Sequence, residues 1–403
     1  MTTDPADASG TSDASGSSGP TLGVEEEYLL LDRRTWLPSP RAPQVQAAAD
    51  LEYRLGPDEV DDELLQAQVE VATPVCGSLA EVAGHLDRFR TAVATAAGRA
   101  GCLLAATGAA PFASDEEVPV TENPRYRLMR ADAAQLVDEQ LITGMHIHVA
   151  VPDRSAGAAA LGRLRPWLPV LVALGANSPF WNGRDTGFGS WRTVVFGRWP
   201  VSGSPPFTTD AKEYEERADA LLATGVIRDR HQLYWHARLS DEYPTLEVRA
   251  PDVQLDTASA VTLAGISRAL VVTALRETRE GAPALDPPGS IVYAAGWHAA
   301  RHGLDADLVH PLSGVPAPAA EVADALLEHL APALDELGDT RRVTDGVRQL
   351  LEEGTGAARQ RRALRDGGLE GLLGVIAPQA RGTAPATGPG EDPGGAGDAP
   401  DRP

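Results

Sequence analysis

The sequence of 403 residues contains a single lysine, Lys212, and every other basic residue is arginine. A P-loop needs a lysine after its glycines to reach the nucleotide phosphates, so this class of ATP site is excluded. Lys212 stands among Glu213, Glu215 and Glu216 in a stretch expected to be a solvated helix, which argues against a Schiff-base lysine. Any phosphate chemistry must therefore rely on arginines and metal ions.

Cysteine, positive charge and long apolar runs are scarce as well. Cys76 and Cys102 form no disulfide framework and lack metal-ligand spacing, so we expect two buried thiols in a reducing cytoplasm. The net charge of −22 argues against nucleic acid or an anionic membrane as the main partner. The longest apolar run, residues 167–176, contains a proline and is too short to cross a bilayer. Residues 1–20 lack the basic and apolar blocks of a signal peptide.

The remaining composition is that of a globular protein. Hydrophobic residues make up 43% of the chain, enough for a substantial core. Residues 1–20 and 381–403 have the composition of disordered tails. No repeat or clear linker interrupts residues 21–380, which we predict to form one domain. Strands are expected mainly before residue 250 and helices after it, which indicates an α+β fold.

Two histidines stand in the alternating stretch 143–149. Apolar Met145, Ile147 and Val149 alternate with His146 and His148, the period-2 pattern of a half-buried strand. The two imidazoles therefore point to the same face. For a lone His-x-His, a hydrogen-bonded pair on a solvated face would be the simpler interpretation.

Two further stretches change that interpretation. Glu25 and Glu27, and likewise Glu247 and Arg249, alternate with apolar residues and share a face. Exposed carboxylates on an edge strand are the alternative for the first pair. Like charges this close repel unless a cation holds them. Three strands that each offer paired polar side chains predict one metal-lined sheet.

A fourth polar face is expected within residues 61–73. Gln66, Gln68 and Glu70 share one face there, and the apolar residues share the other. Glu63 is out of phase with Glu70 and reaches the same site only if the chain bends between them.

The stretch 177–206 is rich in glycine and proline, yet it holds three tryptophans and the arginines Arg184, Arg192 and Arg198. A loop this long in a compact domain is usually functional. Arginines between aromatic residues suit a nucleotide base and its phosphates. An ordered surface loop fixed by its tryptophans is the alternative.

Other elements follow from periodicity and capping residues, among them a capping box at residues 78–81. His298 and His302 lie one helical turn apart with no acid to complete a site, so we expect them to be structural. Helices are predicted near 78–101, 126–140, 156–176, from 210, and at 256–279, 291–302, 319–337 and up to 365, with strands at 22–32, 102–106 and 232–239.

Together these segments resemble the carboxylate–amine ligases of the glutamate–cysteine ligase type 2 family, distant relatives of glutamine synthetase. The resemblance spans residues 21–375. It implies a curved, mainly antiparallel sheet surrounded by helices, a glutamine-synthetase-like catalytic fold. It also implies ATP at one end of a funnel-shaped site, with Mg²⁺ or Mn²⁺ between the nucleotide and an amino-acid carboxylate. The motifs that carry it are Gly23-Val-Glu25-Glu-Glu27, Gln68-Val-Glu70, Gly144-Met-His146-Ile-His148, Asn177-Ser178-Pro and Glu247-Val-Arg249-Ala-Pro-Asp252.

The resemblance also implies roles for individual residues. Glu25, His146 and Glu247 are expected to hold the metal near the ATP phosphates. Arg249 is expected to contact the transferring phosphoryl group, and His148 to lie by the phosphates. Glu27, Glu70 and Glu63 are expected to hold a metal nearer the acceptor. The expected catalytic residues are Glu70, Arg192 and Arg249. The expected nucleotide contacts are Arg198, Arg249 and His148.

The implied activity is ATP-dependent activation of the γ-carboxylate of L-glutamate and its joining to an amine such as L-cysteine. Relatives often have Thr-His-Pro where this chain has Ala109-Ala110-Pro111, so a polar contact is missing. One alternative is a metal-dependent amidohydrolase that recruits His231, His236 and Asp252, although the βα repeat of such barrels is absent. Another is an inactive paralogue that binds metal and nucleotide. We expect a cytoplasmic protein with small-molecule substrates, and a homodimer remains open.

Overall fold

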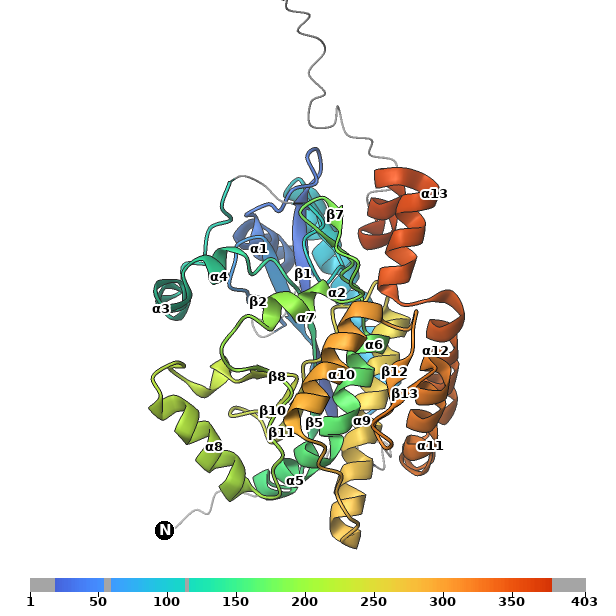
Figure 1. The fold of residues 1–403 in the computed structure, drawn as a ribbon. Coiled ribbons are helices and arrows are strands. Elements are labelled where there is room, and N and C mark those ends of the chain that lie inside the picture. The colour runs from blue at the N-terminus through green and yellow to red at the C-terminus, as the bar shows by residue number, and fades with distance from the viewer. Residues whose placement is uncertain (1–18, 54–58, 113–115, 379–403) are drawn as a thin grey trace, which may run out of the picture.

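A computed structural model describes residues 19–53, 59–112 and 116–378 (Figure 1). Its centre is an antiparallel sheet built around the long strand β1, which pairs with β3 on one side and, one after the other along its length, with β5 and β4 on the other. The strand order is β10-β11-β5-β1-β3-β2, with β4 joined to the second half of β1. The strands of this sheet are β1 (Leu22–Asp32), β2 (Val60–Asp62), β3 (Gln68–Ala72), β4 (Cys102–Ala105), β5 (Met145–Ala150), β10 (Ala237–Leu239) and β11 (Thr245–Val248).

Helices surround the sheet, and three two-stranded ladders link the loops. The ladders pair β6 (Phe180–Trp181) with β7 (Arg184–Asp185), β8 (Ser202–Gly203) with β9 (Tyr234–Trp235), and β12 (Leu308–Val309) with β13 (Pro316–Ala317). The helices are α1 (Ala42–Tyr53), α2 (Leu79–Arg99), α3 (Pro124–Ala133), α4 (Gln135–Asp138), α5 (Arg154–Leu164), α6 (Leu168–Leu174), α7 (Trp191–Phe196), α8 (Ala211–Ala223), α9 (Thr257–Glu280), α10 (Gly289–His302), α11 (Ala319–Leu337), α12 (Thr340–Glu353) and α13 (Gly356–Ile376).

The two faces of the sheet differ in polarity because alternate residues of each strand point to opposite sides. Val24, Met145, Ile147 and Leu246 are almost fully buried and belong to the largest apolar cluster. The helix α9 packs against β5 and against α2, α5, α11 and α12. Figure 1 shows the helices that follow residue 256 gathered on one side of the sheet, with α3 and α8 on the other. The expected α+β fold with its antiparallel sheet is confirmed.

Glu26 is an acid on the apolar face. It is fully buried, and it accepts hydrogen bonds from Arg90 Nε at 3.0 Å and from the Tyr28 hydroxyl. Arg90 also donates to the carbonyl oxygen of Gln254 at 3.0 Å. The middle acid of the three-glutamate run is therefore structural, because a buried charge needs a paired and hydrogen-bonded partner.

Three expected elements are divided in the structure. The helix expected at 156–176 is α5, a 3₁₀ turn (Arg165–Trp167) and α6, because Pro166 and Pro169 lack the N–H that a continuous helix requires. The helix expected at 126–140 breaks at Ala134, which has a φ of 47°. The strand expected at 232–239 is β9 and β10, which pair with different strands.

The polar strand within 61–73 is also two strands, β2 and β3, which pair with each other. Of the expected tails, residues 1–18 and 381–403 lie outside the described residues. Pro20 is described, and its carbonyl oxygen accepts from Arg268 Nε at 2.8 Å. The single-domain assignment stays a prediction.

Within residues 19–53, 59–112 and 116–378, one helix is long and apolar enough to cross a membrane by length and composition. This helix is α9, and 83% of its most apolar window is buried inside the protein. Thr262, Ser267, Arg268 and Thr273 interrupt its apolar residues, so none of its uninterrupted apolar runs is as long as residues 167–176. Its burial is that of a core helix.

Candidate active site

The register of four strands sets polar side chains of the sheet opposite one another. Cross-strand neighbours share a face, so each opposed pair presents its two side chains together. The polar side chains that alternate along each strand therefore form rows across the sheet. The opposed pairs are Glu247 with His148, His146 with Glu25, and Glu27 with Glu70.

Side chains from these rows form three candidate metal-binding groups. In each group, one ligand atom from every member lies within 4.8 Å of the others. The groups overlap, so they make one continuous patch of carboxylate oxygens and imidazole nitrogens. Such donors fit Mg²⁺, and the histidines also suit Mn²⁺. The groups are Glu25–His148–Glu247, Glu25–Glu70–His146 and Glu27–Glu63–Glu70.

Glu63 reaches this patch because the chain turns between β2 and β3. Glu63 was expected to reach the site of Glu70 only if the chain bends between them, and the structure contains this bend. Its Oε2 accepts from the backbone N–H of Leu64 at 2.7 Å, which fixes the carboxylate.

Glu25, His146 and Glu247, the set expected to hold the metal near the phosphates, do not all fall in one of these groups. Glu25 and Glu247 group with His148, whereas His146 groups with Glu25 and Glu70. The guanidinium of Arg249 contacts Glu247 and lies 3.5 Å from His146 Nδ1. His146 Nδ1 lies 2.9 Å from Glu25, and the expected set stays a prediction.

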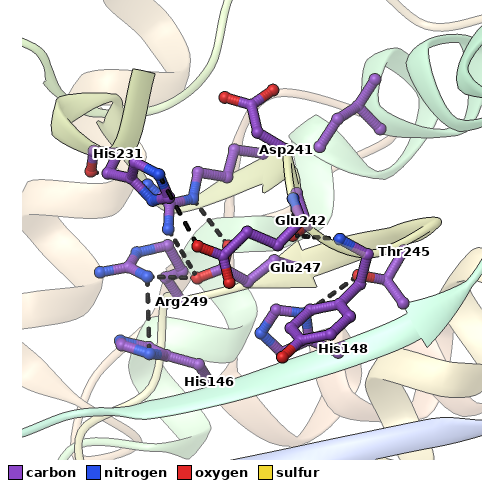
Figure 2. A network of polar contacts seen from close by, with 12 residues as sticks. His146, His148, His231, Asp241, Glu242, Thr245, Glu247 and Arg249 are labelled. Carbon is purple, nitrogen blue, oxygen red and sulfur yellow. Dashed lines mark hydrogen bonds and ion pairs between the residues drawn. The ribbon is translucent and has the colours of Figure 1, made fainter. Parts of the chain in front are cut away.

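Glu247 is held between Arg238 and Arg249, of which Figure 2 labels Arg249. Arg238 Nε donates to its Oε2 at 2.7 Å across the β10–β11 pair, and Arg249 donates to its Oε1. Arg238 was not among the residues predicted from the sequence, although its alternation with Ala237 and Leu239 carries the same period-2 signal. These two guanidiniums supply the fixed positive charge that the lysine-poor sequence requires.

Opposite charges shift the acids at this end of the patch. Burial alone raises the pKa of Glu25, but hydrogen bonds with His146 and His148 outweigh it and hold the pKa far below the usual range. Burial raises the pKa of Glu247 too, and the charges of Arg249 and Arg238 bring it well below its ordinary value. Both acids are therefore ionised.

The acids at the other end behave in the opposite way. Burial, and next the charge of Glu27, raises the pKa of Glu63 from 4.5 to about 8. Burial, and next the charges of Glu25 and Glu63, also raises the pKa of Glu70 well above its usual value. A bound cation would favour the ionised form of both acids.

We predict that Glu63→Gln raises the melting temperature of the metal-free protein at pH 8. A carboxyl whose pKa is raised on folding binds its proton more tightly when folded, so the metal-free fold loses stability as the pH rises from about 4.5 to about 8. Gln keeps the shape without the charge. Mg²⁺ should stabilise the unaltered protein more than the variant in calorimetric melts.

Glu352→Gln on the exposed end of α12 serves as the control and should leave both melting temperatures unchanged. A lower melting temperature for metal-free Glu63→Gln at pH 8 would contradict carboxylate repulsion in the patch.

A cavity of about 240 Å³ opens over the patch. His231, Asp241 and Glu242 lie around Glu247 and Arg249 at one side, as Figure 2 shows. The other side is more apolar and includes Tyr126, whose pKa is raised by burial and by nearby Glu63 and Glu70. Phe196 and Trp199 lie in the stretch 177–206, which the sequence indicated as functional, whereas the other apolar wall residues carried no local signal and come from separate elements. The apolar part of the wall is formed by Tyr126, Met129, Ile142, Phe196, Trp199 and Tyr234.

The three arginines of the stretch 177–206 lie in different surroundings. Arg192 lies on α7 and lines the cavity, with its side chain 4% exposed. Arg198 follows the end of that short helix, pairs with Glu139 and borders a different hollow. Arg184 is exposed on β7. The geometry supports Arg192 as a site residue and does not support Arg198 as a nucleotide contact.

The residues proposed for an amidohydrolase do not converge. His231 lines the cavity, but His236 lines the hollow that Arg198 borders. Asp252 is fully buried and accepts hydrogen bonds from Asn177 and Ser178. The antiparallel sheet also differs from the parallel barrel of such hydrolases.

Ala109 and Ala110, which precede Pro111, are buried. They belong to two apolar clusters, and Ala109 bridges to Ile142. Both positions therefore contribute packing.

The antiparallel sheet enclosed by helices, with acids, histidines and arginines on one face, is the glutamine-synthetase-like fold expected from the sequence. Two solved structures share the fold. Glutamate–cysteine ligase from Francisella tularensis in complex with AMP aligns over 90% of this chain and 88% of its own, with a TM-score of 0.63 at 12% identity. A bifunctional glutathione synthetase from Pasteurella multocida aligns with a TM-score of 0.64 at 15% identity, and 90% of this chain spans 52% of its length.

The family follows from the sequence. The family described as glutamate–cysteine ligase family 2 matches residues 21–375. A Nocardia farcinica protein named "Putative glutamate–cysteine ligase 2-1" is 43% identical over 85% of this chain and 88% of its own. A Streptomyces coelicolor protein named "Putative glutamate–cysteine ligase 2" is 41% identical over 88% of this chain and 97% of its own. The chain belongs to the glutamate–cysteine ligase family 2.

Proposed function

We propose that the protein is an ATP-dependent carboxylate–amine ligase that activates the γ-carboxylate of L-glutamate and joins it to an amine such as L-cysteine. The observation that carries the proposal is the overlap of three metal-binding groups beside Arg238 and Arg249 in one cavity. Family membership supports the reaction class, and the AMP in the Francisella ligase supports an adenine nucleotide.

The chemistry explains why such a site is needed. Amide formation from a carboxylate requires a better leaving group than oxide, and phosphorylation provides one. A carboxylate oxygen attacks the γ-phosphorus of ATP, and ADP leaves. The amine nitrogen then attacks the acyl carbon, phosphate leaves with the former carboxylate oxygen, and the amine proton passes to solvent. Phosphoryl transfer depends mainly on positioning and on neutralising negative charge.

The residues of the chain divide this work. Arg249 keeps a buried Nε–H without a partner among the described residues, a donor available to phosphoryl oxygens. Gly144 donates its N–H to Glu27 at 2.6 Å and so fixes that carboxylate. Divalent cations, when bound, neutralise charge on the phosphoryl oxygens. The residues that would hold them are Glu25, His148 and Glu247 on the arginine side, and Glu27, Glu63 and Glu70 on the other, with His146 between.

The test is phosphate release from ATP in the presence of Mg²⁺ and pairs of acids and amines. Release should require an acid, increase with an amine, and be greatest with L-glutamate as the acid. With hydroxylamine as the amine, a hydroxamate should accumulate in amounts equal to the phosphate released.

Three results would contradict the proposal. Hydrolysis of amides without ATP would indicate a hydrolase. Nucleotide binding without phosphate release under any pair would indicate an inactive paralogue. Phosphate release at a rate that does not depend on the acid would indicate a simple ATPase.

A further inference from the structure

Arg192 is a buried cation without a close carboxylate partner. Both of its Nη atoms lie 3.3 Å from a single acceptor, the carbonyl oxygen of Arg249. Among the described residues, the guanidinium makes no other hydrogen bond. Arg238 and Arg249, by contrast, both bind Glu247 directly. A guanidinium that is nearly buried and lines the cavity retains donors for an anionic ligand.

Asp252 lies behind this guanidinium. Its Oδ1 is 3.9 Å from Arg192 Nη1, and its side chain is fully buried. Three donors fix the carboxylate: the backbone N–H of Asn177 at 2.8 Å, the hydroxyl of Ser178 at 2.7 Å and the hydroxyl of Ser190 at 2.8 Å. Asp252 therefore cannot swing toward the arginine, and it acts as a fixed counter-charge.

The same network reaches the backbone of the helix that carries Arg192. Ser178 Oγ accepts from the backbone N–H of Arg192 at 3.0 Å, and Ser190 caps α7 through its hydrogen bond from Thr193 N–H. One acid thus sets both the charge behind Arg192 and the start of its helix.

Two glycines make room for the pair. A Cβ on Gly144 would lie 2.2 Å from Arg192 Nη2, and a Cβ on Gly108 would lie 2.6 Å from the carboxyl carbon of Asp252. The guanidinium is further confined by the ring of Phe196, whose centroid lies 5.3 Å from Arg192 Cζ. Side-chain space, charge and hydrogen bonding all select one position of Arg192.

We infer that Arg192 binds a carboxylate of the acid substrate and that Asp252 is a positioning residue that acts through Arg192. Arg192 faces two negative groups, Asp252 and Glu27, and one positive group, Arg249. When Glu27 is occupied by a cation, Asp252 is the charge that keeps Arg192 in place against Arg249. The inference rests on the proposed function, because the ligand is taken to be the acid of the ligase reaction.

The test uses Asp252→Asn, Gly144→Ala, Arg192→Lys and the double variant Asp252→Asn/Arg192→Lys. Asn keeps one oxygen for Asn177 and Ser178 and removes the charge behind Arg192. We expect Asp252→Asn to raise the KM for L-glutamate about 10-fold or more, with the KM for ATP changed less than about twofold. Gly144→Ala should show the same selective effect, because it displaces the guanidinium directly.

Gly84→Ala on α2 is the control. Its Cβ would have no neighbour within 4 Å, so both KM values should stay unchanged. In the Arg192→Lys background, Asp252→Asn should raise the KM for L-glutamate little further, because a residue that acts through Arg192 has no effect once Arg192 is replaced. Fully additive effects, or equal losses toward glutamate and ATP, would overturn the inference. If Asp252→Asn does not fold, an unchanged glutamate KM in Gly144→Ala overturns it.

A second measurement separates this inference from the proposed function. If the unaltered protein releases no phosphate, the ligase proposal fails, and calorimetric titration of L-glutamate with Mg²⁺ and a non-hydrolysable ATP analogue decides the inference. Weaker glutamate binding in Asp252→Asn and Gly144→Ala supports it. Equal affinity in all variants, or no binding to the unaltered protein, overturns it.

Discussion

Arg249→Lys is expected to lower ATP-dependent phosphate release by about 10²-fold or more while the protein stays folded. Arg249 donates to Glu247, approaches His146 at 3.5 Å and keeps a buried Nε–H that has no partner in the described part of the chain. A planar guanidinium makes these contacts at once, whereas an ammonium is a single point charge on a flexible stem. The loss should appear in kcat, because the free N–H acts on charge that develops during transfer.

The measurement is steady-state phosphate release together with circular dichroism. Arg90→Lys is the matched control, since Arg90 is half-buried on the opposite face and pairs with Glu26. That variant should lose stability and keep kcat per folded molecule. Near-normal turnover in Arg249→Lys would restrict Arg249 to a structural ion pair.

Glu25→Gln is expected to reduce turnover as severely, by about 10²-fold. Glu25 belongs to two of the three metal-binding groups and contacts both histidines of β5. Its loss should therefore weaken two ion sites, whereas Glu63→Gln should weaken one. The readout is the number and affinity of bound Mn²⁺ ions, measured by electron paramagnetic resonance, beside phosphate release.

The comparison of the two variants makes this prediction specific. Equal Mn²⁺ binding in Glu25→Gln and the unaltered protein would contradict a shared ligand. Loss of one ion only, with the second at full affinity, would mean that Glu25 serves a single site.

The acids of the patch illustrate a conflict between stability and function. Burial and mutual repulsion raise the pKa values of Glu63 and Glu70 in the metal-free protein. Removing one charge is expected to stabilise the empty fold and to impair metal binding at the same time. Stabilising changes at functional sites commonly have this effect.

The sequence by itself determined the strands and their polar faces. The alternation around Glu25, His146 and Glu247 predicted which side chains share a face, because the pleat of a strand sends alternate residues to opposite sides. The single lysine excluded a P-loop, and the resemblance carried by the strand motifs predicted the family and fold that the comparisons confirmed. These conclusions depend on local geometry, which a few consecutive residues fix.

The tertiary structure decided which polar residues meet. Strand register set Glu247 opposite His148, and the side chain of Arg249 contacts Glu247 and approaches His146. The ends of α7 placed Arg192 in the cavity and left Arg198 outside it. The apolar wall and the hydrogen bonds of Asp252 join segments more than 60 residues apart. Such contacts arise from packing between distant elements, and no local pattern of residues encodes them.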